Sequence, residues 1–194
     1  MAFSNSNLKK ALLPGLLLLS AGAMAYALRP VKIPSYAPIL DHFDIEKYSG
    51  KWYEIARFDF RHEKHLSQVT AEYSLNEDGS IHVINRGFHT KKQKWQEAVG
   101  KAKPNGKPGQ SAFKVSFFGP FYSGYNVVKI TADYKNALIF GENRDYLWIL
   151  SRSSEMSDTT KNRFLKVARD AGYDLDRLVW TEHDVDEKNR LNKK

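Results

Sequence analysis

Cysteine is absent from all 194 residues of this chain. Its absence excludes disulfides, a thiol nucleophile, and metal or cluster sites ligated by cysteine. The signatures H-E-x-x-H and G-x-S-x-G are also absent. His62 and His65 stand three residues apart, but they lie in a polar segment that we expect to be a loop, where this spacing does not form a metal site. We therefore expect a protein that is not an enzyme and that has no metal or other cofactor.

Long apolar runs are scarce, and the run "ALLPGLLLLS" is broken by Pro14 and Gly15. Two lysines precede it, and the small-residue segment "AGAMAYA" follows. This order is typical of a secretory signal, and the run is too short for a comfortable transmembrane helix. We predict a signal peptide at residues 1–27, with an uncleaved anchor as the alternative. No cysteine follows the run, which argues against a lipidated amino terminus.

The remaining chain divides into three parts. Three prolines in residues 28–40 predict an extended, semi-rigid leader. Residues 41–183 hold the predicted domain, and residues 184–194 form a charged tail.

Positive charge exceeds negative charge, and the formal net charge is +8. Such a balance is compatible with nucleic acid, an anionic membrane surface or an acidic ligand. A nucleic-acid-binding barrel is therefore one alternative, but the export signal and the number of strands argue against it. We expect no nucleic-acid partner.

Short strand-like segments separated by turn signals run from "KWYEIARFDF" to "DYLWILSR". Eight such segments with short links predict an all-β fold, an eight-stranded up-and-down antiparallel β-barrel. One α-helix follows and flanks the barrel: Ser157 or Asp158 caps it, Phe164 and Ala168 lie on its apolar stripe, and Gly172 ends it. A barrel of eight strands has an interior that can hold one small ligand.

The stretch "SFFGPFYSGY", residues 116–125, places five aromatic rings around a Gly-Pro turn. Exposed aromatic patches usually mark a binding surface. The predicted contacts of this loop are a lipid, a membrane or a partner subunit, and the sequence does not separate them.

Three motifs resemble those of the lipocalin family: "GKWYEIARF" at the first strand, "TADY" at a later turn, and Arg152 after "WILS". The resemblance covers residues 41–183. Segments such as "VTAEYSL" and "KVSFFGPFY" are similar to the bacterial outer-membrane and apolipoprotein D-like lipocalins. For this family the resemblance implies an exported protein of the periplasm or outer membrane, here without a lipidated cysteine.

The resemblance also implies roles for individual residues. Trp52 and Arg152 are expected to seal the closed barrel end by a cation–π contact, with Gly50, Asp133 and Tyr134 as structural motif residues. Alternation along the last strand then points Trp148 into the cavity. Likeness to the apolipoprotein D pocket adds Tyr73 and Asn85, and Tyr122 past the Pro turn is a further candidate for ligand binding.

Basic side chains are expected at the same rim as the aromatic loop, namely Arg61, His65, His89 and Lys91. They would attract an anionic headgroup or a membrane face. The implied function is binding, storage or transport of fatty acids or lysophospholipids for envelope maintenance or stress response. The alternative is a barrel that does not transport and instead forms a homodimer or docks on membranes through the aromatic loop.

Overall fold

The computed structural model of the protein describes residues 22, 24–25, 29–60 and 63–183. The predicted signal peptide and charged tail lie almost wholly outside these residues. In the described part of the chain, no helix has the length and apolar character needed to cross a membrane. The elements are α2 (Ile45–Tyr48), β1 (Gly50–Phe58), β2 (Leu66–Leu75), β3 (Ile81–His89), β4 (Lys94–Pro104), β5 (Ala112–Phe118), β6 (Phe121–Ile130), β7 (Asn136–Gly141), β8 (Leu147–Ser151), α3 (Asp158–Asp170), the 3-10 helix η1 (Leu175–Arg177) and β9 (Leu178–Trp180).

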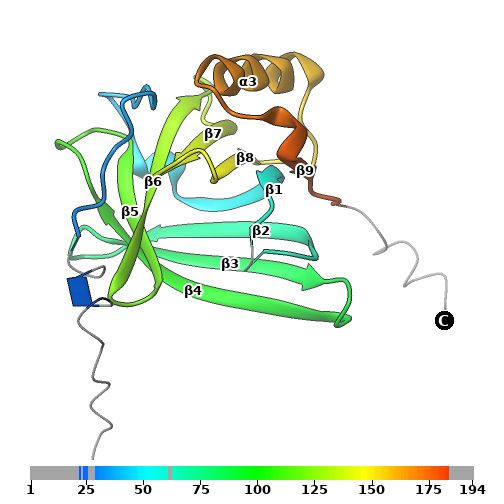
Figure 1. Cartoon of the computed structure of the whole chain (residues 1–194), viewed down its shortest axis with the longest axis horizontal. Helices are drawn as coiled ribbons and strands as arrows, with labels where there is room; N and C mark the ends of the chain where they lie inside the picture. Colours follow the sequence, from blue (N-terminus) through cyan, green and yellow to red (C-terminus); the bar gives the residue numbers. More distant parts are fainter. Residues whose placement is uncertain (1–21, 23, 26–28, 61–62, 184–194) are drawn as a thin grey trace, which may run out of the picture.

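Strands β1 to β8 form a closed antiparallel barrel in which each strand pairs with its neighbours in the sequence (Figure 1). The barrel closes through β1, because Tyr53 pairs with Thr70 of β2 on one side and with Ser151 of β8 on the other. The short strand β9 pairs with the far end of β1, where Phe58 lies opposite Leu178. The eight-stranded up-and-down barrel predicted from the sequence is confirmed.

The connections alternate between the two barrel ends, as the up-and-down topology requires. At the open end lie the described residues 59–60 and 63–65, together with the connections 90–93, 119–120 and 142–146. Helix α2 and the connections after β2, β4 and β6 lie at the closed end. The aromatic segment is a tight hairpin at the open end, in which Phe118 pairs with Phe121.

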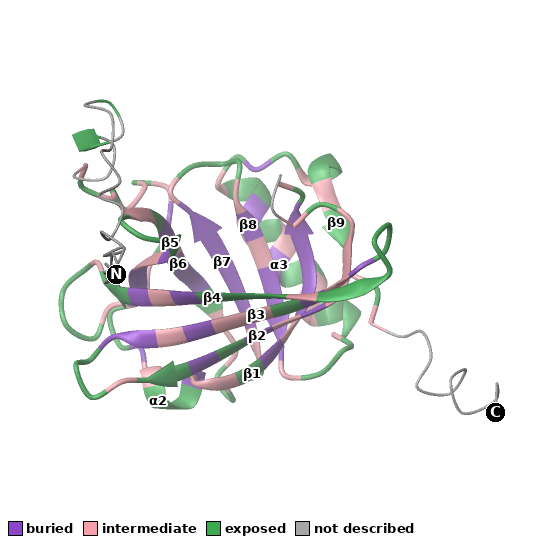
Figure 2. Cartoon of the chain, turned by 90° about the horizontal axis from the view of Figure 1, so that it is seen from below, coloured by how far each residue is buried: buried purple, intermediate pink, exposed green. Residues whose placement is uncertain are grey.

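The C-terminal helix α3 covers one outer side of the barrel near β7 and β8 (Figure 1). The Ser157 hydroxyl caps it by accepting a hydrogen bond from Thr160 N, as expected for a serine at this position. Phe164 and Ala168 are buried in a cluster formed with outward-facing side chains of β7 and β8. Figure 2 shows these strands as largely buried, whereas β4 is exposed along much of its length. The helix therefore gives the barrel a second core outside its interior.

The leader segment is held against the barrel. Arg29 forms a 2.8 Å ion pair with Glu142, and Leu40 N donates to the Ser111 hydroxyl at 2.8 Å. Ala37 is buried in the outer core. Residues 29–40 thus belong to the packed structure.

The closed end is sealed by a stack of two side chains. The Arg152 guanidinium carbon lies 3.9 Å from the centre of the Trp52 ring, and Trp52 is fully buried. Arg152 donates to the carbonyls of Lys51 at 2.7 Å and Ser49 at 2.8 Å. Gly50 has φ +94°, and a Cβ there would lie 3.4 Å from Arg152 Nη1, so both the backbone conformation and the neighbouring guanidinium favour glycine.

The other two motif residues order the adjoining turn. The Tyr134 hydroxyl accepts a hydrogen bond from Asp44 N at 2.9 Å. The Asp133 carboxylate accepts from the Thr131 hydroxyl at 2.6 Å. These contacts tie the β6–β7 turn together and to the start of α2, in keeping with a structural role.

Candidate ligand-binding cavity

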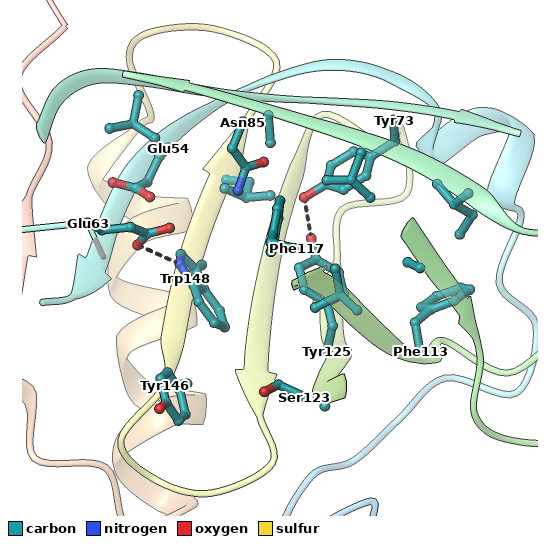
Figure 3. A pocket seen from close by; sticks show the side chains of 18 of the residues that line it. Glu54, Glu63, Tyr73, Asn85, Phe113, Phe117, Ser123, Tyr125, Tyr146 and Trp148 are labelled. Atoms are coloured by element: carbon teal, nitrogen blue, oxygen red, sulfur yellow. Dashed lines mark hydrogen bonds between the residues drawn. The ribbon is translucent and has the colours of Figure 1, made fainter. Parts of the chain in front are cut away.

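The barrel interior contains a cavity of about 330 Å³. This volume is at the lower end of the range of about 300–1,000 Å³ for small-molecule sites. Figure 3 shows side chains converging on it from strands on several sides of the barrel. The lining has an apolar part that includes Tyr48, Tyr73, Ile81, Val83, Phe113, Val115 and Tyr125, and a polar part that includes Glu54, Glu63, Asn85, Tyr146 and Trp148.

Three tyrosines link the lower cavity to the sealed end, and we call Tyr48, Tyr73 and Tyr125 the tyrosine floor. The Tyr125 hydroxyl lies 2.6 Å from that of Tyr48 and 2.9 Å from that of Tyr73 (Figure 3). The Tyr48 ring lies 4.8 Å from that of Trp52. Burial raises the pKa of all three phenols, so they remain neutral hydrogen-bonding groups.

A bulge in β1 brings an acid and a base to the interior together. Glu54 pairs with Leu150, but Ala56 pairs with Ile149, so one extra residue, Ile55, interrupts the pairing. Without it, strict alternation would direct Glu54 and Ala56 inward. With it, the inward side chains are Glu54 and Arg57, and they form a buried ion pair of 2.6 Å.

The ion pair is part of a larger cluster, and we call Glu54, Arg57 and Glu63 the acidic wall. Arg57 Nε lies 3.7 Å from Glu63 Oε2, and Arg57 Nη2 donates to the Glu63 carbonyl at 2.8 Å. Trp148 Nε1 donates to Glu63 Oε2 at 3.2 Å (Figure 3). The Thr181 hydroxyl donates to Glu54 Oε1 at 2.6 Å. The wall thus holds two carboxylates at the cavity surface around one guanidinium.

Burial acts on the pKa values of Glu63 and Arg57 in opposite directions. Burial raises the pKa of Glu63 well above its usual value, and the nearby Glu54 charge adds to the rise. The bond from Trp148 and the Arg57 charge oppose it only in part. For Arg57, burial disfavours the charge but the carboxylates outweigh it, so its pKa is raised. Glu63 is therefore the group of the wall that most readily takes up a proton.

Asn85 adds a polar atom with no protein partner. Its side chain lines the cavity, and its Oδ1 is buried without a hydrogen bond from the described residues. A buried amide oxygen of this kind favours a hydrogen-bond donor on whatever enters the cavity.

Three of the four ligand-binding candidates from the sequence lie at the cavity: Tyr73, Asn85 and Trp148. Tyr122 differs from the expectation, because it does not belong to the lining and Lys114 Nζ lies 5.6 Å from its ring. The reason is strand parity. Strand β6 begins at Phe121, so alternation turns Phe121, Ser123 and Tyr125 inward and Tyr122 outward.

One of the basic rim residues, Arg61, lies outside the described residues. The other three, His65, His89 and Lys91, do not line the cavity. The rings of His65 and His89 lie 5.8 Å apart, and His89 Nδ1 accepts from Lys92 N at 3.3 Å. Partial desolvation, helped by nearby lysines, lowers the pKa of His65, and Lys91 is exposed. These groups form a basic edge outside the opening rather than a headgroup site inside it.

Sequence reasoning missed the acidic wall and Tyr125. A signal for Glu54 was present, because it is two residues from Trp52 in an alternating strand. Arg57 became predictable only with the bulge, and Glu63 lies in an irregular connection where alternation gives no direction. In the described part of the chain, no group of three or more potential ligand side chains is arranged to hold a metal ion.

The sequence profile of the Lipocalin-like domain matches residues 43–183. The chain is 44% identical over 171 residues to the outer membrane lipoprotein Blc of Escherichia coli K12, which covers 88% of this chain and 97% of the relative. It is 30% identical over 181 residues to apolipoprotein D of Bos taurus, covering 88% and 93% of the two chains.

Solved structures share the fold at lower identity. Lobster apocrustacyanin A1 superposes with a TM-score of 0.61 at 19% identity, over 79% of this chain and 94% of the other. This likeness concerns the fold alone, whereas the sequence relatives match nearly the whole length of the chain.

Proposed function

Because the chain belongs to the lipocalin family, whose members bind small hydrophobic molecules, we propose that its barrel binds and carries amphipathic lipids of the fatty-acid or lysophospholipid class. Like its lipocalin relatives, the protein is a binding protein and not an enzyme. The observation that carries the proposal is that one cavity has both an apolar part around Tyr73 and a polar part around Glu63. A lining of this kind suits a molecule with a chain and a head.

The apolar part supplies most of the affinity in this proposal. Each CH₂ group removed from water contributes about 0.8 kcal/mol. Tyr73 and Phe113 would contact the chain, and Asn85 Oδ1 would accept a hydrogen bond from a hydroxyl or ammonium group of the ligand. The hydrogen-bonded tyrosine floor limits the depth that the chain reaches.

In the same proposal, the basic edge brings the open end of the barrel to a membrane surface. His65, His89 and Lys91, together with Arg61, would attract the anionic membrane from which a lipid is taken up. The bacterial relatives are outer membrane lipoproteins by name, which supports an exported protein of the envelope. These 194 residues contain no cysteine, so we propose that this chain works there without a thioether-linked lipid anchor.

Intrinsic fluorescence tests the proposal. Trp148 lines the cavity, Trp52 is sealed at the closed end, and Trp95 and Trp180 are about half exposed at 52% and 44%. The full chain, stripped of bound lipid, is titrated with oleate and with a lysophospholipid. We expect saturable quenching at one ligand per chain, lost in Trp148→Phe and kept in the matched control Trp95→Phe. A flat titration in stripped protein would refute lipid binding.

A second candidate function rests on exposed apolar side chains at the open end. Trp95 and Val99 are 52% exposed on β4, and Phe117 and Phe118 on the adjoining β5 are 42% and 79% exposed and also border the cavity. Such a patch suits docking on a membrane or on a second copy of the chain. Val99→Ser would weaken vesicle binding or dimerisation under this alternative. It would leave the Trp148 quenching unchanged, because Val99 does not line the cavity.

A further inference from the structure

Three aromatic rings cluster around the part of the cavity that contains Glu63. The Phe60 ring lies 5.5 Å from that of Tyr146 and 5.9 Å from that of Trp148, and the last two are stacked at 6.1 Å. All three residues line the cavity together with Glu63. We call Phe60, Tyr146 and Trp148 the aromatic cage.

The cage and the carboxylate are joined by a direct contact. Trp148 Nε1 donates to Glu63 Oε2 at 3.2 Å, which places the carboxylate beside the indole ring (Figure 3). The faces of aromatic rings attract cations, and aromatic cages are a recurrent way to bind quaternary ammonium groups. When it is ionised, a carboxylate beside the cage adds its negative charge to the same preference.

Negative charges outnumber positive charges around Arg57. Glu54 bonds to Arg57 at 2.6 Å, Glu63 lies 3.7 Å from it, and Asp59 lies 3.4 Å from it. Three carboxylates therefore share this guanidinium, and Glu54 and Glu63 both face the cavity. A buried negative excess is costly unless a proton or a cation balances it.

From these contacts we propose that the aromatic cage and Glu63 form a subsite for the ammonium group of an amphiphile whose chain fills the apolar part of the cavity. The inference rests on the proposed function of lipid binding, and within it selects lipids that carry a cationic nitrogen over fatty acids. A fatty-acid carboxylate at this place would face Glu63 and Glu54, and the described cation beside them, Arg57, already pairs with both. The preference opposes the net charge of +8, which by itself attracts anions.

The test compares four amphiphiles with the same dodecyl chain on the full, lipid-stripped protein. They are dodecyltrimethylammonium, dodecylphosphocholine, dodecanoate and the neutral dodecanoylglycerol, each titrated calorimetrically at neutral pH below its micelle-forming concentration. We expect dodecyltrimethylammonium to bind about tenfold more tightly than dodecanoylglycerol, and dodecanoate to bind more weakly. Dodecylphosphocholine tests whether the subsite also takes the ammonium of a zwitterionic phospholipid head. Binding as tight as that of dodecyltrimethylammonium assigns the ammonium to a phospholipid head, and binding no tighter than that of dodecanoylglycerol assigns it to a simpler amine.

Variants separate the subsite from general electrostatics. Glu63→Gln keeps an acceptor for Trp148 and is expected to remove the tenfold preference, while dodecanoylglycerol binding stays within about twofold. Tyr146→Leu removes one cage ring and should weaken the ammonium by about threefold. The control Glu97→Gln makes the same charge change on the exposed side of β4, where Glu97 pairs with Arg86, and should leave the preference intact.

Two results would overturn the inference. One is equal binding of the ammonium and neutral amphiphiles by the native chain. The other is an equal effect of Glu63→Gln and Glu97→Gln. If dodecanoate and dodecanoylglycerol bind but the ammonium gains nothing, only this subsite fails. If none of the four amphiphiles binds, the proposed lipid-binding function fails with it.

Discussion

Two arginines mark the two ends of the barrel, and they are held in opposite ways. Arg152 at the closed end stacks on Trp52 and donates to backbone carbonyls. Arg57 in the open half is bonded by Glu54 and approached by Glu63 and Asp59. Burial lowers the pKa of Arg152, whereas the carboxylates raise that of Arg57 despite its burial.

The difference separates a structural seal from a responsive surface. Neutral carbonyls and an indole do not titrate, so the closed end keeps one arrangement as pH or ligand changes. The acidic wall faces the cavity with more negative than positive charge, so a proton or a ligand cation changes its balance. We therefore expect protonation and charge pairing to change with pH or ligand in the open half of the barrel and not at the closed end.

The largest effect on this comparison should come from Arg57→Met. It leaves Glu54 and Glu63 buried without their cation, and loss of one partner of a buried pair costs about 3–5 kcal/mol. Urea unfolding measures the free energy. Adding Glu54→Gln and Glu63→Gln to the same chain should recover part of the loss. A cost for Arg57→Met below that of Arg152→Met would break the comparison.

Arg152→Met should have a smaller effect. It removes hydrogen bonds to carbonyls that water can partly replace, together with the stack on Trp52, so we expect a loss of about 2 kcal/mol. Unfolding of this variant should keep the pH dependence of the native chain, and its binding of dodecanoylglycerol should be unchanged. A changed pH profile would show that the closed end is coupled to the acidic wall.

Glu63 gives the open half a pH dependence of defined sign. Its pKa is raised in the folded chain, so the folded state binds more protons than the unfolded state between the two pKa values. Its contribution to stability is therefore lost as pH rises from the ordinary carboxyl range through the raised pKa. The groups acting on the pKa of Glu63 are Glu54, Trp148, Arg57 and Asp59, and the Glu63 charge in turn raises the pKa of Tyr73 on β2.

Glu63→Gln should remove this slope and make the chain more stable than the native protein by about 1 kcal/mol at neutral pH. Urea unfolding at a series of pH values measures it. Glu97→Gln on the exposed side of β4 is the matched control and should keep the native slope. Parallel pH profiles for the native chain and Glu63→Gln would contradict the raised pKa.

The smallest predicted effect is a shift of that profile by Trp148→Phe. Loss of the Nε1 donor removes a bond that favours the charged Glu63, so the pKa of Glu63 rises further and the stability decline extends to higher pH. The stability change itself should be about 1 kcal/mol. Trp95→Phe should leave the profile in place, and a shift to lower pH would reverse the assigned role of the bond.

Much of this architecture was predictable because it follows regular patterns. The strand alternation that turns Arg152 inward also turns Leu150 and Trp148 inward, and it worked because β8 has no bulge. Helix α3 was predictable from its serine cap and apolar stripe. Two residues could not be placed by simple alternation along the sequence. Arg57 was missed because the bulge at Ile55 turns it inward. Tyr122 was wrongly placed in the cavity because β6 begins at Phe121, which turns Tyr122 outward.

The most direct test of the account is to locate both ends of a bound amphiphile. Nuclear Overhauser contacts would be measured between dodecyltrimethylammonium and the full chain, with the Trp148 and Tyr73 side chains assigned. The account predicts contacts from the N-methyl protons to Trp148 and Tyr146, and from the terminal chain methyl to Tyr73 and Phe113. Contacts confined to Trp95 and Val99 on the outer surface, or a head placed at the tyrosine floor, would contradict it.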